Sequence, residues 1–271
     1  MTDRTLPLGR DSAYPNKYQP DLLFAIARSE SRDSYLSGDL PFDGADLWNA
    51  WELTWLKPDG LPVVATAEIR IPADSPNLIE SKSLKLYLNS FAMSHFEDAK
   101  EVRRRVTEDL SSRAGASISV QIQMLDETRL NAVSELPGLC LDALAATPTS
   151  WEADPGVLKI DAGASVEEDL HSHLLRSLCP VTGQPDIGSI AIHYRGPRIV
   201  HTSLLQYIVS FRLHKAFHEA CIERMFVDIL DRCQPERLGL YARYQRRGGI
   251  DINPMRSNYG LAADNLRLWR Q

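Results

Sequence analysis

Hydrophobic and polar residues alternate along two neighbouring segments in the first third of the chain. The first segment spans residues 47–56, with Asn49 as the one polar residue on its apolar face, and the second spans residues 63–71 before Pro72. Alternation with a period of two places every second side chain on the same face of a β-strand. Because the turn-forming residues Lys-Pro-Asp-Gly at positions 57–60 separate the segments, the pattern predicts a β-hairpin.

The next segments predict two helices and a third strand. Apolar residues recur at helical spacing over residues 83–93 and again from Phe96 to Arg113, and Gly115 is expected to end the second helix. Residues 118–124 return to the alternation of a strand. The first half of the chain therefore has the predicted order strand, strand, helix, helix, strand.

The same order of elements returns in the second half. Strands are predicted at residues 157–160 and 189–194, helices at 204–211 and 212–232, and a last strand at 238–244. Two copies of one order predict an α+β fold of two tandem modules, each with a pair of helices on one face of an antiparallel sheet. We assign residues 1–145 to the first module and residues 146–271 to the second.

The two copies differ in the connection between their first two strands, which is a short turn in the first copy and spans residues 161–188 in the second. This connection holds most of the stretch SLCPVTGQPDIGS, residues 177–189, whose prolines and glycines exclude a helix. Long connections in compact domains often carry function. A nucleophilic thiol needs a proton acceptor nearby, so Cys179 and Asp186 are candidate catalytic residues.

Composition and charge narrow the class of protein. The 271 residues include 30 Lys and Arg against 36 Asp and Glu, and the dispersed basic residues argue against a nucleic-acid partner. No apolar run is long enough to span a membrane, and the N-terminal stretch lacks the apolar core of a signal peptide, so we expect a cytoplasmic protein. The four cysteines include no CxxC pair and are expected to be reduced. Apart from Cys179, we expect them to be small buried side chains.

Residues 77–91 place charged side chains where a loop enters a predicted helix. Lys82 and Lys85 are three residues apart and follow Glu80, so both ammonium groups can face one side and hold phosphate oxygens. Ser81 or Ser83 can cap the helix, whose N-terminus also attracts anions. A capped, solvated helix start explains these residues equally well without a ligand.

Residues 214–226 raise the question of a metal. His214 and His218 are four residues apart, with Glu219 beside the second and Cys221 three residues further on. Histidine and cysteine are zinc ligands, although the order here is HxxxHE rather than HExxH. A partly buried histidine that shares a helix with core residues is the simpler interpretation.

Residues 246–257, RRGGIDINPMRS, combine two glycines with Asn-Pro and predict an irregular exposed loop. In such a loop Arg247 and Arg256 can clamp phosphate groups, although a basic loop without a ligand is the alternative. Neither a GxGxxG nor a Walker motif occurs, so a nucleotide would have to be held in another way.

Four of these stretches together carry a family resemblance. They are ESKSLKLY at residues 80–87, CPVTGQPD at 179–186, FHE at 217–219 and GGIDINP at 248–254. In this order they closely resemble the motifs of the 7-cyano-7-deazaguanine reductases of the queuosine pathway, the nitrile reductases, in their long two-module form. The likeness extends from the region of Asn16 to the C-terminal tail and shows no departure at a motif position.

The resemblance implies a fold and an activity. The fold is the tunnelling fold (T-fold) shared with GTP cyclohydrolase I. The activity is the NADPH-dependent reduction of the nitrile of 7-cyano-7-deazaguanine to the aminomethyl group of 7-aminomethyl-7-deazaguanine. The resemblance also implies a homodimer, no catalytic metal, and a site that combines residues of both modules.

The resemblance further implies roles for single residues. Cys179 is expected to form a covalent thioimidate, Asp186 to pass the thiol proton to the nitrile nitrogen, and His218 to assist proton transfer. The expected substrate-binding residues are Glu80, Ser81, Phe217 and Glu219. The expected NADPH-binding residues are Ser81, Lys82, Lys85, Gly248 and Arg256.

Two other classes of function compete with the reductase. A zinc-dependent hydrolase similar to GTP cyclohydrolase would use Cys179 together with His171, His173 or His218 as ligands. A purine-binding module without catalysis would use Glu80 and Glu219 but gives no reason for the cysteine and aspartate pair. Metal content and a covalent adduct distinguish the three possibilities.

Overall fold

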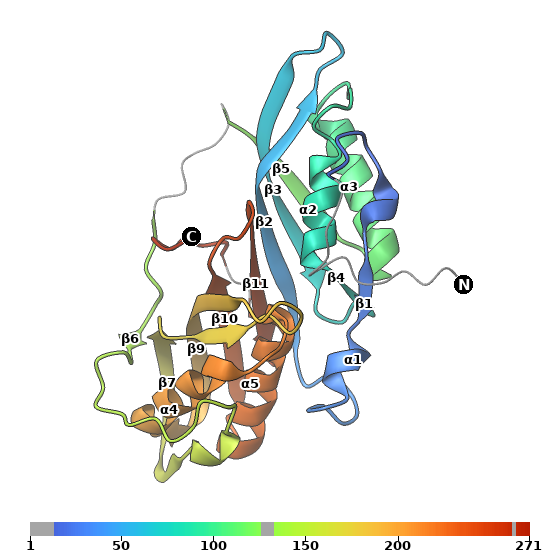
Figure 1. Cartoon of the computed structure of the whole chain (residues 1–271). Coiled ribbons are helices and arrows are strands. Elements are labelled where there is room, and N and C mark those ends of the chain that lie inside the picture. Colours follow the sequence, from blue (N-terminus) through green and yellow to red (C-terminus); the bar gives the residue numbers. More distant parts are fainter. Residues whose placement is uncertain (1–13, 126–132, 262–263) are drawn as a thin grey trace. The chain divides into compact units, whose positions relative to one another are not determined.

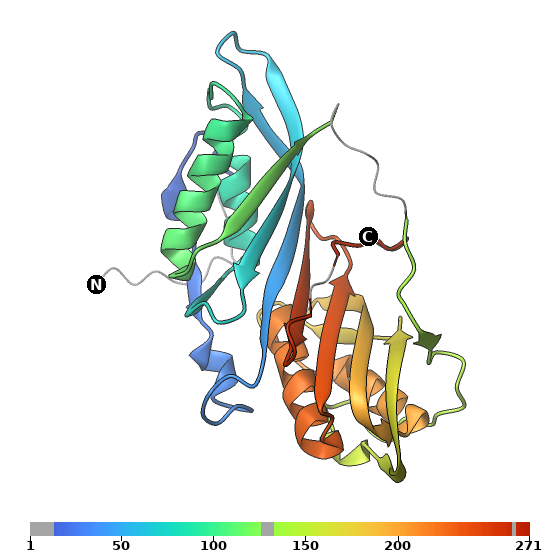
Figure 2. The ribbon, with the colours of Figure 1, turned by 180° about the vertical axis from the view of Figure 1, so that it is seen from behind.

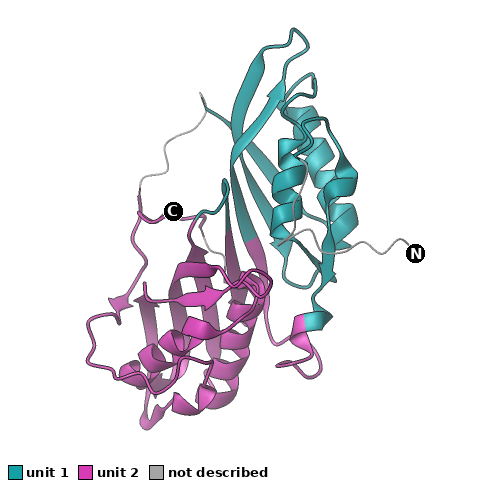
Figure 3. Ribbon diagram, in the orientation of Figure 1, with its two compact units in different colours: residues 1–30, 47–131, 246–251 teal, residues 31–46, 132–245, 252–271 magenta. Residues whose placement is uncertain are grey.

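The computed structural model describes residues 14–125, 133–261 and 264–271, and the chain divides into two compact units. Unit 1 comprises residues 1–30, 47–131 and 246–251, and unit 2 comprises residues 31–46, 132–245 and 252–271 (Figure 3). Each unit is discontinuous in sequence because the strands β2 (Asp43–Leu56) and β11 (Ile250–Ser257) contribute residues to both. The module boundary between residues 145 and 146 stays a prediction.

Unit 1 is a sheet with two helices on one of its faces (Figure 1). Its strands lie in the order β5 (Ser119–Met124), β3 (Pro62–Pro72), β2, and the helices are α2 (Ser81–Asn89) and α3 (Ala99–Ala114). The buried residues of α3 include Val102, Val106 and Leu110, which follow one helical stripe. The smaller elements are η1 (Pro20–Leu22), β1 (Ala25–Ala27) and β4 (Asn77–Ile79), while α1 (Ser29–Arg32) lies where unit 1 passes into unit 2.

Unit 2 repeats this arrangement with more strands. Its sheet has the order β11, β10 (Arg237–Tyr244), β9 (Pro185–Ile199), β7 (Ile160–Ser172), β6 (Leu139–Cys140), and β8 (Arg176–Leu178) pairs with β9. The helices are α4 (His201–Ser210) and α5 (His218–Cys233), with the short η2 (Pro155–Val157) and η3 (Phe211–Leu213). Figure 2 shows the strands of unit 2 in front of α4 and α5, which cover the other face.

The predicted α+β class is confirmed, and the predicted element order recurs if the short strands β4 and β8 are set aside. Strand, strand, helix, helix, strand occurs as β2, β3, α2, α3, β5 in the first half of the chain and as β7, β9, α4, α5, β10 in the second. The pairs β1–β4, β3–β5, β7–β9, β8–β9, β9–β10 and β10–β11 are antiparallel, whereas β6 pairs parallel with β7. Gly115 ends α3 in the left-handed conformation with φ 73°, as expected for a glycine cap. The fold is therefore α+β and rich in antiparallel pairs.

The strand predicted at residues 189–194 lies within β9, but the prediction of a first strand at residues 157–160 is wrong. Residues 155–157 form the turn η2, and β7 begins only at Ile160. The supposed long connection is mostly strand, because β7, β8 and the start of β9 occupy most of residues 161–188. The sequence of β7 lacks the alternation of apolar and polar residues that predicts a strand, because most of its residues are exposed, small or charged. Its pairing with β9, which nothing in its own sequence reveals, holds it in place.

Two further segments differ from the prediction. The helix predicted over residues 212–232 begins at His218, because residues 214–216 are extended and pair with Leu178. The predicted exposed loop at 246–257 is a tight turn followed by the buried strand β11. Within this strand the Asn253 side chain accepts a hydrogen bond from Tyr244 N, next to Pro254, which has no N–H to donate. Among the described helices, none is long and apolar enough to span a membrane.

Candidate active site

Cys179 and Asp186 lie at the two sides of one hairpin turn in unit 2. Cys179 follows β8 directly and Asp186 is the second residue of β9, so the loop between the strands is far shorter than predicted. Cys179 N donates to Gln184 O at 2.9 Å, and Gly183 N donates to Cys179 O at 3.0 Å. In the register Ser177 faces Asp186. Because side chains alternate along strands, Ser177, Cys179 and Asp186 project from the same face of the hairpin.

The start of α5 belongs to the same region of unit 2. Leu178, the residue before Cys179, donates from its N to His214 O at 2.8 Å and accepts at its O from Ala216 N at 3.1 Å. These bonds tie β8 to the segment that immediately precedes α5. The extended segment that shortens the helix relative to the prediction is thus the element that brings His218 close to the hairpin.

His218 faces the hairpin carboxylate. Its Nε2 lies 3.4 Å from Asp186 Oδ1, and its ring stacks on the ring of Tyr244 with 4.0 Å between centroids. Cys179 and Asp186 are 6% and 4% exposed. A thiol, a carboxylate and an imidazole, all largely shielded from water, can hold a nucleophile and move protons to and from a bound molecule.

Two residues that the sequence analysis did not single out complete this cluster. Ser177 and Tyr244 are fully buried, and their hydroxyl groups lie close to each other and to the Cys221 thiol. The sequence does not indicate a functional role for Tyr244, because this residue occupies an apolar position in the alternation of β10.

The neighbouring thiol Cys221 is not a second nucleophile. It is buried in α5, and burial, followed by the charges of Asp186 and Glu219, raises its pKa to about 12. A thiol with such a pKa stays protonated at neutral pH and is a poor nucleophile. Cys221 is therefore the small buried side chain that the sequence predicts, as is Cys233, whereas Cys140 is exposed, contrary to the prediction.

The two remaining predicted residues of unit 2 flank His218. Phe217 is the residue before α5 and is partly exposed, and Glu219 in the first turn of the helix is buried. A buried carboxylate beside a partly exposed aromatic ring can accept N–H donors of a flat heterocycle that packs on the ring.

Glu80 in unit 1 caps α2 with its side chain. Its two carboxylate oxygens accept from Lys82 N and Ser83 N, each at 2.7 Å, and the residue is fully buried. Burial raises the pKa of Glu80, and the two helix N–H groups and the nearby lysines oppose this effect only in part. The predicted capping residues Ser81 and Ser83 follow inside the helix, so the cap is a glutamate rather than a serine.

The raised pKa of Glu80 predicts how a neutral variant responds to pH. A carboxyl group with a folded-state pKa above its unfolded value of 4.5 costs stability as pH rises from that value through the folded pKa. Glutamine cannot ionise, so the free energy of unfolding of Glu80→Gln should rise relative to wild type as the pH increases across this window. Urea unfolding at several pH values measures the difference, and a difference that falls with pH would contradict it.

Two predicted NADPH-binding residues come together in unit 1. Residues 247–250 form a tight turn in which Gly248 and Gly249 have φ of 60° and 81°, a conformation that other residues rarely adopt. A Cβ on Gly248 would lie 3.3 Å from the Lys85 side chain, so the lysine stem runs along the turn. Ser81 and Lys82 occupy the first turn of the helix that carries Lys85, and all three are partly exposed.

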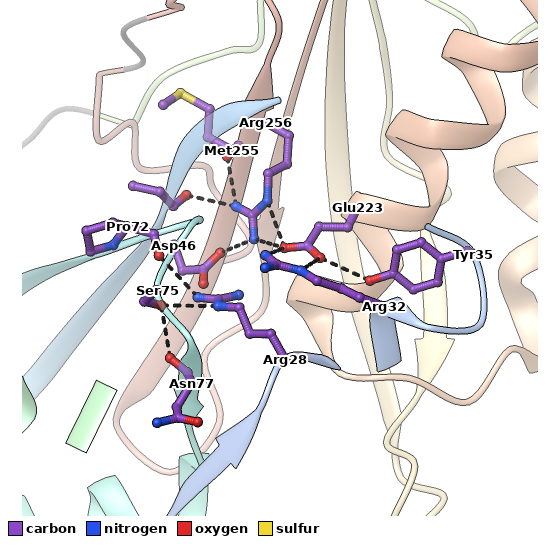
Figure 4. Close-up of polar contacts among 11 residues, drawn as sticks. Arg28, Arg32, Tyr35, Asp46, Pro72, Ser75, Asn77, Glu223, Met255 and Arg256 are labelled. Carbon is purple, nitrogen blue, oxygen red and sulfur yellow. Dashed lines mark hydrogen bonds and ion pairs between the residues drawn. The ribbon is translucent and has the colours of Figure 1, made fainter. Parts of the chain in front are cut away.

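Arg256 is the third basic residue expected to bind NADPH, and its environment differs from that of Lys82 and Lys85. It is fully buried in unit 2, and its Nη2 lies 2.7 Å from both Asp46 Oδ1 and Glu223 Oε1 (Figure 4). Burial alone would lower the pKa of the guanidinium, but these carboxylates outweigh it and raise the pKa. Arg32 and Tyr35 also contact Glu223. The expectation that Arg256 lies in an exposed loop is therefore wrong, and its charge is engaged by carboxylates.

The histidines considered for zinc do not gather around Cys179. His214 precedes α5 and packs its ring on Phe211, so His214 and His218 do not share a helical face. Burial lowers the pKa of His214. His171 and His173 form a group with Cys140 instead. Within the described ranges, Cys179 belongs to no set of three side chains close enough to hold a metal.

An α+β scaffold that joins a shielded thiol to a carboxylate and an imidazole is typical of enzymes with a cysteine nucleophile. Comparison with known proteins narrows this class. Residues 14–122 match the family described as nitrile reductase, 7-cyano-7-deazaguanine-reductase N-term, and residues 185–261 match the QueF-like proteins. Proteins from Paraburkholderia xenovorans and Paraburkholderia phytofirmans, each named NADPH-dependent 7-cyano-7-deazaguanine reductase, are 49% identical over the full length of both chains. The chain belongs to the family of NADPH-dependent 7-cyano-7-deazaguanine reductases.

Proposed function

We propose that the chain reduces the nitrile group of 7-cyano-7-deazaguanine to the aminomethyl group of 7-aminomethyl-7-deazaguanine, with NADPH as reductant and Cys179 as covalent nucleophile. The observation that carries the proposal is the hairpin in which Cys179 follows β8 and pairs with Gln184, next to Asp186, whose Oδ1 lies 3.4 Å from His218 Nε2. Family membership supplies the substrate, which geometry alone does not define.

Cys179 activates a carbon that is a poor electrophile. Its sulfur adds to the nitrile carbon, one C–N π bond is lost, and a thioimidate with a C=N double bond remains attached to the protein. The thiol proton must reach the nitrile nitrogen, where negative charge develops. Asp186, on the same face of the hairpin, takes this proton from sulfur and delivers it to nitrogen.

His218 supplies and collects the later protons with Asp186. NADPH, when bound, delivers a hydride to the carbon in each of two reduction steps. Between these steps the C–S bond breaks, the electron pair returns to sulfur, and the Cys179 thiol regains a proton. In balance, one nitrile, two NADPH and two protons give one primary amine and two NADP⁺. The stacked contact with Tyr244 holds the His218 ring in position for the proton transfers.

The substrate base is recognised by carboxylates and an aromatic ring. Glu219 accepts its N–H donors and Phe217 packs beside it. The family resemblance also assigns Glu80 and Ser81 of unit 1 to substrate binding. Each carboxylate oxygen has two lone pairs, so the capping bonds of Glu80 leave it acceptor capacity.

The phosphate groups of NADPH fit the basic surface of unit 1. Lys82 and Lys85 offer ammonium groups at the start of α2, where backbone N–H groups favour anions. The turn at Gly248 lets the backbone approach a phosphate closely. Arg247 precedes this turn and is partly exposed, so we assign it the role first expected of the buried Arg256.

We also propose that the two modules are tandem T-folds and that the protein is a cytoplasmic homodimer. The repeated element order and the family resemblance support the first part. The resemblance to the two-module reductases supports the second. Sedimentation equilibrium of the purified chain tests the dimer directly.

The proposed activity predicts a stoichiometry. Addition of limiting 7-cyano-7-deazaguanine to the protein should oxidise two NADPH for each nitrile consumed, because reduction of a nitrile to a primary amine requires two hydride transfers. Absorbance follows NADPH, and mass spectrometry identifies the product. A protein that consumes the nitrile without oxidising NADPH would instead be a hydrolase, and one that binds it unchanged would be a binding module.

A further inference from the structure

Cys140, His171 and His173 form a compact group of metal-binding side chains in unit 2. One ligand atom from each lies within 4.8 Å of the others. Zinc bound to sulfur at about 2.3 Å and to nitrogen at about 2.0 Å sets donor atoms about 3.5 Å apart in a tetrahedron. A contraction of about an ångström is within reach, because Cys140 is exposed on the short edge strand β6.

The fold creates this group through strand register. β6 pairs parallel with β7 at one edge of the sheet (Figure 1). Cys140 lies directly opposite His171 in this register. His173 follows two residues further along the same chain segment, so both rings can project from one side. Gly138, with φ 79°, makes the pairing possible, since a Cβ at this position would lie only 1.8 Å from Asp169 O.

Hydrogen bonds orient both imidazole rings. His171 Nδ1 lies 2.9 Å from Pro137 O, which is only an acceptor, so Nδ1 carries the proton and Nε2 keeps its lone pair. His173 Nδ1 lies 2.8 Å from Ser189 Oγ, which can accept the same kind of bond. A ring that donates from one nitrogen and offers the other is the usual arrangement of histidine ligands.

The surroundings also suit a cation. Asp142 accepts hydrogen bonds from Ser172 Oγ and His173 N, which places a carboxylate beside the group. Arg270 donates to Ser189 Oγ and His173 O, so its positive charge opposes the effect of this carboxylate.

We propose that Cys140, His171 and His173 bind one divalent cation of the zinc class, with the thiol of Cys140 losing its proton on binding and water completing the coordination. Thiolate and imidazole donors favour such borderline ions over magnesium or calcium. The site is separate from Cys179 and takes no part in the nitrile reduction. Its effect is to fasten the edge strand β6 to β7.

Cobalt binding tests the site without relying on activity. Untagged full-length protein, stripped with a chelator and transferred to chelator-free buffer, is titrated with Co²⁺. We expect a thiolate-to-cobalt charge-transfer band in the near ultraviolet that saturates at one ion per chain and disappears when Zn²⁺ is added. Zinc should also raise the melting temperature of the wild type, because it binds only the folded state.

Two thiol variants locate the ligand. Cys140→Ser should abolish the band and the thermal shift, while Cys179→Ser should keep both. Loss of the band in Cys179→Ser with retention in Cys140→Ser would overturn the proposal in favour of a metal at the catalytic loop. Absence of any band or thermal shift in the wild type would also overturn it.

Histidine variants separate coordination from folding. His173→Asn should lower the Co²⁺ affinity by far more than Ser189→Ala, for which loss of an orienting hydrogen bond predicts a decrease of roughly tenfold. The matched control His95→Asn removes an exposed imidazole of unit 1 and should bind Co²⁺ like the wild type. Equal affinities of His173→Asn and the control would rule out this histidine as a ligand.

Discussion

Replacing Cys179 with alanine is expected to abolish both turnover and the covalent adduct. Without sulfur there is no thioimidate, and a free nitrile offers a hydride donor only a poor electrophile. The loss in kcat should be on the order of 10³-fold or more, as for other enzymes that lose their nucleophile. NADPH oxidation measures turnover, and intact-protein mass spectrometry without NADPH should show the wild type, but not the variant, heavier by one substrate molecule.

Cys140→Ser is the matched control for this experiment. It removes an exposed thiol of the same unit and should leave both the adduct and turnover intact. If Cys179→Ala retained turnover with a correct fold, a direct hydride transfer to the nitrile would replace the covalent mechanism. If the adduct formed in Cys179→Ala but not in Cys140→Ser, the nucleophile would be Cys140 rather than Cys179.

The parts of the fold that could be predicted from sequence are those with local periodicity. The hairpin of β2 and β3 and the helices α2 and α3 each bury one face, so apolar residues recur at the period of the element. β7 lacks this signal because most of its residues are exposed or half exposed. Its identity as a strand depends on hydrogen bonds to β9, which pair residues such as Glu168 and Tyr194 that are 26 positions apart.

The strand β11 is not predicted from the sequence because it is fully buried and yet contains polar residues. All eight of its residues are buried, including the polar residues Asp251, Asn253 and Arg256. Polar residues are typical of exposed loops, which is why the sequence predicts a loop here. Each of these side chains has partners elsewhere in its own unit: Asp251 accepts from Asn49, Asn253 from Tyr244, and Arg256 donates to Glu223. These partners lie 9, 33 and 202 positions away and leave no periodic pattern, so sequence periodicity cannot distinguish a buried arginine with its partners from an exposed one.

In the candidate site, too, some residues could be predicted from the sequence and others could not. Cys179 and Asp186 were recognised because a Pro- and Gly-rich motif carries them, although the loop between them is shorter than predicted. Tyr244 and Ser177 were not recognised, since their proximity to Cys221 and Asp186 arises from strand register and from the position of α5. Motifs identify the reacting groups, whereas the residues that hold them in place emerge only from the three-dimensional arrangement.

Replacing Arg256 with methionine is expected to destabilise the protein by about 3–5 kcal/mol, the usual cost of removing one partner from a buried ion pair. Asp46 is fully buried and would lose its 2.7 Å contact with Nη2, while Glu223 would keep Arg32 and Tyr35. Urea unfolding of unliganded protein measures the loss. Adding Asp46→Asn to the variant should recover part of it, because the carboxylate that has lost the Arg256 guanidinium is then replaced by a neutral amide.

Arg247→Met is the matched control, since it removes the same charge from a partly exposed position. Its free energy of unfolding should stay within about 0.5 kcal/mol of wild type, as for most surface substitutions. Its KM for NADPH should rise roughly tenfold, because a charge-assisted hydrogen bond to phosphate is lost. A stable Arg256→Met protein with weak NADPH binding, next to an unaffected Arg247→Met, would reverse these two assignments. The role first expected of Arg256 would then be correct, and the ion pairs with Asp46 and Glu223 would have to open when NADPH binds.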